Sequence, residues 1–479
     1  MMWRRSVVQA VVLGALSISL FRCAVGPDFV RPDAPAVQRF TPEKEGGSAP
    51  TAEKSKVSER WWQLLHSPQL DQVVEQAMTG NYTLQAALAR LRQSEKTLKA
   101  GYGVFYPQVD GSFDATRQKS NPQSFGGNFP ATIFSLFTLS GTVTYALDIF
   151  GGARRAAEGL KAQVEFQRYT AAAAYLTLTS NLVNTLIARA AYQAQVDATM
   201  DLVRAQKEEI EITRAQVKAG TTSYSGLLSI EGQLYATEAS LAPLQLKLDQ
   251  TNHLLASLVG KTPSEWTAPG ILLSELTLPP DLPLSLPSEL VRQRPDILAS
   301  EAELHYSCAQ VGVATANLYP SFNLNATYGQ NNRSLGNLFR GGSNFWGLGA
   351  GIAAPIFHGG TLRAEKEAAV EAYKASAADY QQTVLNAFTQ VADTLRGLEH
   401  DREALEAQSK SQAATGEALK LVRVNYRSGV ANYIQVLTAN AQYLQSRVSY
   451  TQAVAQRLQD GVALYVALGG GWWESKRFP

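Results

Sequence analysis

The stretch NYTLQAALARLRQSEKTLKAGYGVFYPQVDGSFDATR (Asn81–Arg117) returns in altered form as RPDILASEAELHYSCAQVGVATANLYPSFNLNATYGQ (Arg294–Gln330). Leucines of the first copy align with aliphatic residues of the second, and Tyr106-Pro107 aligns with Tyr319-Pro320. Two further matches follow in the same order: Asp148-Ile-Phe-Gly-Gly152 with Pro355-Ile-Phe-His-Gly-Gly360, and Ala219-Gly220 with Ser428-Gly429. The chain is therefore a tandem repeat, and whatever one half builds the other half builds again.

Each repeat is predicted to form a helix, two strands and two further helices, in this order. Its strand segments alternate between apolar and polar residues. The alternation covers residues 109–116, 137–148 and 321–328, and a less regular, glycine-rich fourth segment spans 345–354. Alternation with period two indicates a sheet whose two faces meet different media. An ordinary antiparallel sheet with one face on a core fits this pattern, and so does a membrane barrel with a wet interior.

The repeat, together with an export signal at the N-terminus, favours the barrel. One chain supplies only four such strands, whereas a closed membrane barrel needs about eight or more. The barrel must then be shared between chains. The simplest symmetric closure is a trimer with four strands from each chain, twelve in total.

Long helices follow each strand pair. No proline occurs between Pro130 and Pro243 or between Pro355 and Pro479, and both stretches are dense in good helix formers. Residues 152–218 are predicted to form one helix of roughly 65 residues, about 100 Å long. Gly220 followed by Thr221, and Gly429 followed by Val430, are typical of the glycine that ends a helix at the tip of a helical hairpin.

The N-terminus is typical of an exported protein. Arg4 and Arg5 precede an apolar run over residues 7–20, which has the length of a signal-peptide core and not the roughly 20 residues of a membrane span. Cys23 follows, where a bacterial lipoprotein carries its acylated cysteine. Arg22 stands where lipoproteins carry Gly or Ala, so an incidental cysteine after an ordinary signal is the alternative. Residues 27–60 are rich in Pro, Glu, Ser and Lys and read as an extended strap.

Composition excludes several classes of function. The 479 residues include 43 Lys+Arg and 41 Asp+Glu, and this net charge of +2 leaves no basic excess for a nucleic-acid partner. The five histidines lack the i, i+3 or i, i+4 pairing of helical metal sites, so no metal site is expected. The chain also lacks a phosphate-binding loop, a metalloprotease motif and a nucleophile elbow. We therefore expect a protein that is not an enzyme and that holds no cofactor.

The segments Cys23–Pro32, Arg292-Gln-Arg-Pro-Asp-Ile297 and Leu318-Tyr-Pro-Ser321, with the paired hairpin tips, resemble one family. The chain looks like a TolC-type outer-membrane factor, in the efflux lipoprotein subfamily that serves resistance-nodulation-division pumps. The resemblance implies a mixed α and membrane β fold: a trimeric 12-strand outer-membrane β-barrel, four strands per chain, continuous with a 12-helix periplasmic α-helical barrel.

The same resemblance implies the function and the partners. It implies the exit duct of a tripartite efflux system, which passes small molecules such as drugs across the periplasm and the outer membrane of a Gram-negative bacterium. The implied partners are two further copies of the chain in a homotrimer, a periplasmic adaptor protein, an inner-membrane efflux pump and the outer-membrane lipid that would hold an acylated Cys23.

The expected segments follow from the repeat and the resemblance. They are a signal peptide (1–22), a strap with lipid anchor (23–60), first-repeat helices (61–107), a first β-hairpin (108–150), a long helical hairpin (151–260), a connector with the second-repeat helix (261–320), a second β-hairpin (321–356), a second long helical hairpin (357–468) and a C-terminal tail (469–479).

The family narrows the periplasmic end of the duct with acidic side chains and with polar links between hairpins. Alignment at Gly429 places these acids at Gln435 and Thr438, which carry no charge. Tyr426 matches a linking tyrosine of the family, and hairpin packing is its alternative role. We therefore expect a periplasmic aperture at Tyr426, Gln435 and Thr438 that relies on packing and neutral hydrogen bonds. The hairpin tips at Gly220, Thr221, Gly429 and Val430 are the expected adaptor contacts.

Two functions from other classes remain open at this point. A trimeric coiled-coil spacer or adhesin shares the long helices and the lipid anchor, but it does not need amphipathic strand pairs at matching points of a repeat. An exported enzyme is the third interpretation, and the sequence shows no clustered polar site that supports it.

Overall fold

The computed structural model describes residues 24–33, 35, 40, 58–120, 130–279 and 290–474. The expected signal peptide, the candidate lipidation residue Cys23, most of the strap and residues 475–479 lie outside this description. The chain divides into two compact units. The first comprises Met1–Pro32, Leu91–Gln167 and Ser300–Tyr380, and the second comprises Asp33–Arg90, Arg168–Ala299 and Gln381–Pro479. Each unit takes segments from both repeats.

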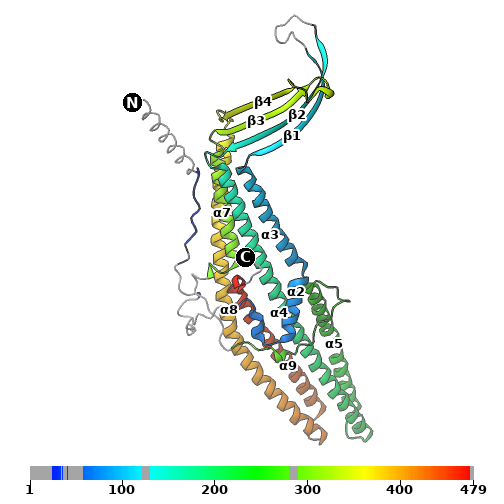
Figure 1. Cartoon of the computed structure of the whole chain (residues 1–479). Coiled ribbons are helices and arrows are strands. Elements are labelled where there is room, and N and C mark those ends of the chain that lie inside the picture. Colours follow the sequence, from blue (N-terminus) through cyan, green and yellow to red (C-terminus); the bar gives the residue numbers. More distant parts are fainter. Residues whose placement is uncertain are drawn as a thin grey trace. The chain divides into compact units, whose positions relative to one another are not determined.

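The first unit carries one antiparallel sheet in the order β1-β2-β3-β4 (Figure 1). Its strands are β1 (Gln108–Ser120), β2 (Thr132–Leu147), β3 (Ser321–Asn332) and β4 (Asn344–Ala353). The register pairs Val109 with Val143, Val143 with Ala326, and Ala326 with Leu348. Because directly paired residues share a face, the alternations of all four strands coincide. The sheet therefore has one apolar face and one polar face.

Helices α3 (Tyr82–Gly101), α4 (Gly152–Lys218), α7 (Pro295–Ala316) and α8 (Thr361–Arg427) contribute to both units. Within the first unit, Gly159 of α4 lies against α7, which allows a close approach of the two helices. The Ser307 and Ser376 hydroxyls, 2.8 Å apart, join α7 to α8. The short 3-10 helices η2 (Tyr102–Phe105) and η5 (Leu335–Asn337) complete this unit.

The second unit is helical. It adds α2 (Pro68–Gly80), α5 (Tyr224–Val259) and α9 (Tyr433–Ala467), with the 3-10 helices η1 (Trp61–Leu65), η4 (Leu273–Glu275) and η6 (Trp472–Glu474). The single helix expected over residues 152–218 is α4, with 67 residues, and α8 has the same length. The repeat thus builds two equal long helices.

The core of the second unit gathers residues from distant parts of the chain. Trp61 and Trp62 are each 1% exposed, and the Trp61 ring stacks on Tyr465 with ring centroids 5.8 Å apart. Burial raises the pKa of Tyr465 to about 12. Arg294, at the start of the second copy of the repeat, donates a hydrogen bond of 2.9 Å to the Ala467 carbonyl. This contact holds the end of α9 in place.

Helix α4 alone, within the described part of the chain, is long and apolar enough to cross a membrane by composition. Its most apolar window is 61% buried inside the structure. This is the environment of a helix packed in a protein core.

Candidate functional site

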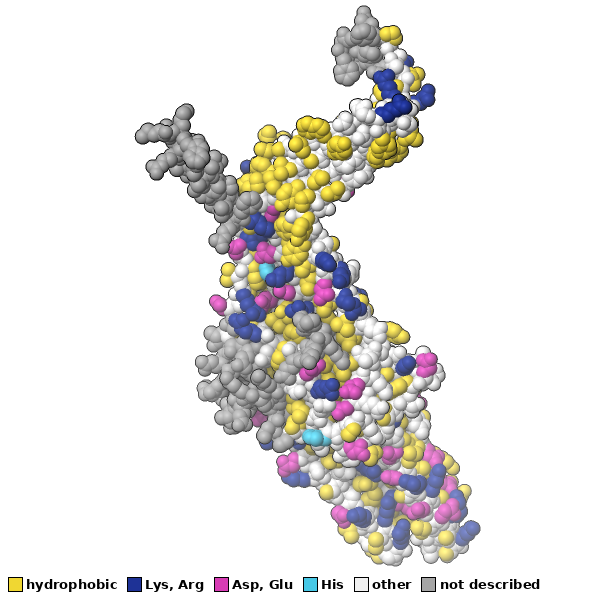
Figure 2. Space-filling model, viewed as in Figure 1, with side chains coloured by type: hydrophobic (Ala, Val, Ile, Leu, Met, Phe, Trp, Pro, Cys, Tyr) yellow, Lys and Arg dark blue, Asp and Glu magenta, His cyan; other side chains and the backbone are white. Residues whose placement is uncertain are grey.

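The apolar face of the sheet carries large hydrophobic side chains without cover in the chain. Trp346, Leu348 and Ile352 of β4 are 70%, 77% and 69% exposed, and Val109 of β1 is 73% exposed. Figure 2 shows hydrophobic side chains gathered over the strands. An exposed apolar surface of this kind marks a contact with lipid or with another protein. The alternative of an ordinary sheet packed on its own core is therefore wrong.

The polar face is lined by hydroxyl and amide groups. The Ser112 and Ser140 hydroxyls lie 2.9 Å apart, and those of Thr142 and Thr327 lie 3.2 Å apart. Asp110 and Asp114 share this face, because they pair with Thr142 and Thr138. They are the only charged side chains that the described strands place on it. Such a face suits water and a mildly negative lumen.

Strands β1 and β4 are the two edges of the sheet, since the strand order places no described strand beyond either of them. An edge strand leaves a row of backbone N–H and C=O groups unpaired. In a bilayer those groups must be paired, which only a closed barrel achieves for a sheet. A single four-stranded sheet with two open edges does not meet this requirement by itself.

The first hairpin tip lies between α4 and α5. Gly220 adopts the left-handed conformation, with φ of 72°, and Thr221 N–H closes the end of α4 on the Gln216 carbonyl at 3.0 Å. The Ser223 hydroxyl then accepts from Gly226 N–H at 3.2 Å and starts α5. The expected turn at Gly220 is confirmed.

The second tip, between α8 and α9, repeats this geometry. Gly429 has φ of 80°, and Val430 N–H reaches the Asn425 carbonyl at 2.8 Å. The Val430 side chain is 78% exposed. Both tips thus present short turns with accessible side chains, as a docking surface requires.

Two of the expected aperture residues make local contacts at the start of α9. Gln435 and Asn432 form a reciprocal cap, in which each side-chain oxygen accepts from the other residue's backbone N–H at 3.0 Å. The Thr438 hydroxyl donates to the Ile434 carbonyl at 2.9 Å. Both side chains are exposed in the single chain. Their role in a shared aperture stays a prediction.

Tyr426, the third expected aperture residue, is buried within the chain, with 5% of its surface exposed. Its hydroxyl is 2.7 Å from the hydroxyl of Thr213 on α4. Thr213 donates its own proton to the Glu209 carbonyl at 2.8 Å, so Tyr426 is the donor to Thr213. Tyr426 therefore links α8 of the second long hairpin to α4 of the first inside one chain. Its role in a shared aperture stays a prediction.

One helical turn away lies a buried charged group that the sequence analysis missed. The Arg423 Nε and Glu209 Oε1 atoms are 2.7 Å apart. Asn440 closes the triangle: its Nδ2 donates to Glu209 Oε2 at 3.0 Å, and its Oδ1 accepts from Arg423 Nη2 at 2.9 Å. We call Glu209, Arg423 and Asn440 the tip triad. It joins α4 to α8 and α9.

Burial governs the electrostatics of the tip triad. Asn440 is fully buried and Glu209 is 5% exposed. Burial raises the pKa of Glu209, although Arg423 and Asn440 oppose the rise. The expected reliance on neutral groups concerns the aperture residues and stays a prediction, and the tip triad adds a buried ion pair inside the chain. No sequence signal pointed to the triad, because each residue is an ordinary polar residue in a polar-rich helix.

In the first unit, the segment that follows Cys23 docks onto α4 and α7. Val25 N–H donates to the Phe150 carbonyl at 3.0 Å, just beyond the end of β2. Phe29 stacks on the ring of His305 with centroids 4.3 Å apart. The Cys308 thiol lies 3.7 Å from the Pro27 carbonyl, and burial raises the pKa of this thiol.

Arg155 is the centre of this docking. Its side chain is 6% exposed and pairs with Asp28 at 2.6 Å and with Glu158 at 2.8 Å. The Oε1 atom of Glu158 also lies 2.9 Å from Nε2 of His305. Burial opposes ionisation of Glu158, but hydrogen bonds from Arg155 and His305 lower its pKa below the usual value. The segment from Val25 to Phe29 is thus held by specific contacts beside the sheet.

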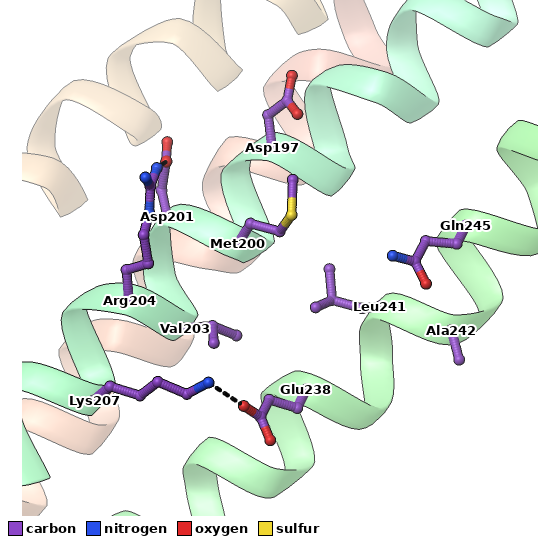
Figure 3. A pocket seen from close by; sticks show the side chains of 10 residues that line it. All are labelled: Asp197, Met200, Asp201, Val203, Arg204, Lys207, Glu238, Leu241, Ala242 and Gln245. Carbon is purple, nitrogen blue, oxygen red and sulfur yellow. Dashed lines mark hydrogen bonds and ion pairs between the residues drawn. The ribbon is translucent and has the colours of Figure 1, made fainter.

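A groove of about 730 Å³ lies between α4 and α5 (Figure 3). Lys207 and Glu238 reach across it and form an ion pair of 2.8 Å. Met200, Val203 and Leu241 supply the rest of its centre. The groove is an interhelical packing surface with ion pairs, and it lacks the arrangement of nucleophile and base that catalysis uses.

Metal binding finds no support in the described ranges, where no group of three or more His, Cys, Asp or Glu side chains is placed to hold an ion.

Known proteins share this architecture. A family model described as "Outer membrane efflux protein" matches residues 73–261 and 286–470. OpmQ of Pseudomonas putida, a pyoverdine export outer membrane protein, is 28% identical over 95% of this chain and 96% of its own length. CusC of Escherichia coli, a cation efflux system protein, is 25% identical over 95% of this chain and 97% of its own.

Solved structures agree. The outer-membrane channel OprN has a TM-score of 0.87 at 28% identity, covering 94% of this chain and 100% of that chain. The CmeC outer membrane channel of Campylobacter jejuni has a TM-score of 0.88 at 22% identity, covering 94% and 95%, and shows the shared fold. The chain belongs to the outer membrane efflux protein family and is an outer membrane efflux channel.

Proposed function

We propose that three copies of this chain form the exit duct of a tripartite efflux system, with a 12-strand barrel in the outer membrane and a 12-helix tunnel in the periplasm. The observation that carries the proposal is the four-stranded sheet, which has an exposed apolar face, an exposed polar face and two open edges. A wall that faces lipid needs the apolar face, and a water-filled lumen needs the polar face. Closure with other copies of the chain pairs the two open edges.

Transport through this duct needs no catalytic group. A wide polar lumen lowers the free energy of a solute within the bilayer, and an inner-membrane pump supplies the work. The proposed partners are a periplasmic adaptor, which would contact the tips at Gly220, Thr221, Gly429 and Val430, and that pump. The proposed cargo is small molecules such as drugs. OpmQ and CusC are named for pyoverdine export and for cation efflux, so related channels serve chemically different cargo.

The test is single-channel conductance in a planar bilayer, with oligomer mass measured on the same purified sample. A trimer with stable pores is the expected result. A trimeric coiled-coil spacer would give a trimer that never conducts, even when the tip triad is disrupted by Arg423→Met. A monomer that does not insert would overturn the shared barrel.

We also propose that Cys23 is acylated. The docking of residues 25–29 supports this, because it holds the segment after Cys23 beside the end of β2, where the bilayer would begin. The mass of the N-terminal peptide tests it: acyl chains on Cys23 are expected, and a free thiol or a retained signal peptide would contradict the anchor. Cys23→Ser is expected to abolish the modification, while Cys308→Ser leaves it intact.

The aperture of the proposed duct would be closed by the hairpins, with Gln435 and Thr438 near the tip and Tyr426 and the tip triad behind them. Since Gln435 and Thr438 carry no charge, divalent cations added from the periplasmic side are expected to block conductance weakly. A strong block that is lost in Gln435→Ala/Thr438→Ala would contradict this.

A further inference from the structure

The two copies of the Ile-Phe motif that follow the strand pairs have different surroundings. Ile149 and Phe150, after β2, are partly buried. Ile356 and Phe357, after β4, are 95% and 86% exposed. The two motifs occupy the same place in the tandem repeat, so the difference lies in what each one meets.

Phe150 meets the second repeat. Its ring stacks on Tyr319 with centroids 4.6 Å apart and an interplanar angle of 24°. This contact lies at the foot of the β2–β3 pair, where Leu147 is opposite Phe322. The stack therefore joins the end of one repeat's second strand to the start of the next repeat's first strand.

The repeat supplies the counterpart of Tyr319 as well. Tyr106-Pro107 aligns with Tyr319-Pro320, and Tyr106 is 69% exposed immediately before β1. Tyr106 and Phe357 stand at opposite edges of the sheet, because β1 and β4 are separated by two strands. Three strand spacings of about 4.8 Å hold them roughly 14 Å apart across the sheet. They cannot stack within one chain.

We infer that Phe357 of one copy stacks on Tyr106 of a second copy, at the foot of an intermolecular β4–β1 pair. The inference rests on the proposed trimer and adds the residues that form its aromatic contact, which we call the Phe357–Tyr106 seam. The occupant is a second copy of this chain and not lipid, because the same motif in the same setting at Phe150 is covered by a Tyr-Pro segment of this chain. The seam is incomplete without the neighbouring copy.

Cysteine cross-linking tests the seam in the full-length protein in its membrane. Tyr106→Cys and Phe357→Cys are combined in a Cys308→Ala background and treated with a short bismaleimide. Phe150→Cys/Tyr319→Cys is the matched positive control, because its two thiols occupy the equivalent positions and must cross-link within one chain. Tyr106→Cys/Phe339→Cys is the negative control, since Phe339 is 75% exposed in the connection between β3 and β4, at the other end of those strands. Each single-cysteine variant reports any product that forms through Cys23.

The expected result is a covalent trimer in the Tyr106→Cys/Phe357→Cys variant, an internal cross-link in the positive control and monomer in the negative control. A trimer by mass whose positive control cross-links, but whose seam variant remains monomeric in denaturant, would overturn the seam and leave the proposed duct intact. A monomer by mass would overturn both.

The seam also predicts a coupled energetic effect. Phe357→Ala and Tyr106→Ala are each expected to weaken association roughly tenfold at each of the three seams of the trimer, and the double variant is expected to add little to either. Phe339→Ala, on an exposed side chain away from the seam, is expected to leave trimer dissociation unchanged. Independent and additive effects of the two seam variants would contradict a direct stack.

Discussion

Arg423→Met removes the cation of the tip triad and keeps most of its aliphatic stem. It leaves Glu209, whose side chain is 6% exposed, without its ion-pair partner. Breaking a buried ion pair from one side costs about 3–5 kcal/mol. The Arg423 side chain is 26% exposed, so water compensates part of the loss. We expect the hairpins to lose about 2–3 kcal/mol of local stability, or roughly 30- to 150-fold in their opening equilibrium.

The pH dependence identifies the cause. Burial already raises the pKa of Glu209 in the folded chain, and loss of Arg423 raises this pKa further. A group whose folded-state pKa lies above its unfolded value favours folding below the unfolded pKa, and this contribution is lost as pH rises through the folded pKa. The variant is therefore expected to lose more stability at alkaline pH, where Glu209 is ionised, than at acidic pH, where Glu209 is protonated.

Native-state hydrogen exchange measures this directly, as protection factors for peptides from the two hairpin ends. Glu209→Gln/Arg423→Met is expected to recover most of the lost protection, because the neutral amide can keep the bond from Asn440. Tyr426→Phe is the control: it removes one neutral hydrogen bond, costs about 0.5–1.5 kcal/mol and adds no pH dependence. Wild-type protection in Arg423→Met at both pH values would refute the reasoning. Additive losses of protection from Glu209→Gln and Arg423→Met in the double variant would refute it as well.

Three other predictions follow from the described geometry. Asp110→Asn/Asp114→Asn removes the carboxylates of the polar face. The reversal potential of the channel in a salt gradient is therefore expected to shift away from cation selectivity. No shift would mean that this face does not line the pore. Gly429→Ala is expected to destabilise the second tip by about 1 kcal/mol, because φ is 80° there, whereas Gly429→Asn costs less; equal protection of the tip in both variants would contradict this. Burial and the facing carboxylate of Asp460 raise the pKa of Asp401 to about 6, so stability is lost as pH rises through about 6. Asp401→Asn is expected to flatten this part of the profile of melting temperature against pH. An unchanged profile would assign this pH dependence to another group.

Much of the fold was predictable from local patterns. The strand alternation, the helix over 152–218 and the turns at Gly220 and Gly429 all appear where the residues indicated. Each depends on a period or a backbone conformation that a few neighbouring residues set by themselves.

The candidate site was less predictable. The alignment that pointed to Tyr426 identified a linking residue but not its partner, Thr213, which lies more than two hundred residues earlier in the chain. The tip triad gave no signal at all. Its members come from three helices, and their chemistry exists only because packing excludes water from Glu209 and Asn440.

The sequence by itself determined the tandem repeat, the two-faced strands and the paired long helices, because each is a pattern in the order of the residues that does not depend on which distant segments pack together. The tertiary structure decided the register that places all four apolar alternations on one face, the docking of residues 25–29 around Arg155, and the burial of Glu209 beside Arg423. These contacts join residues far apart along the chain, and their energies depend on distance and on exclusion of water, which only the packed structure sets.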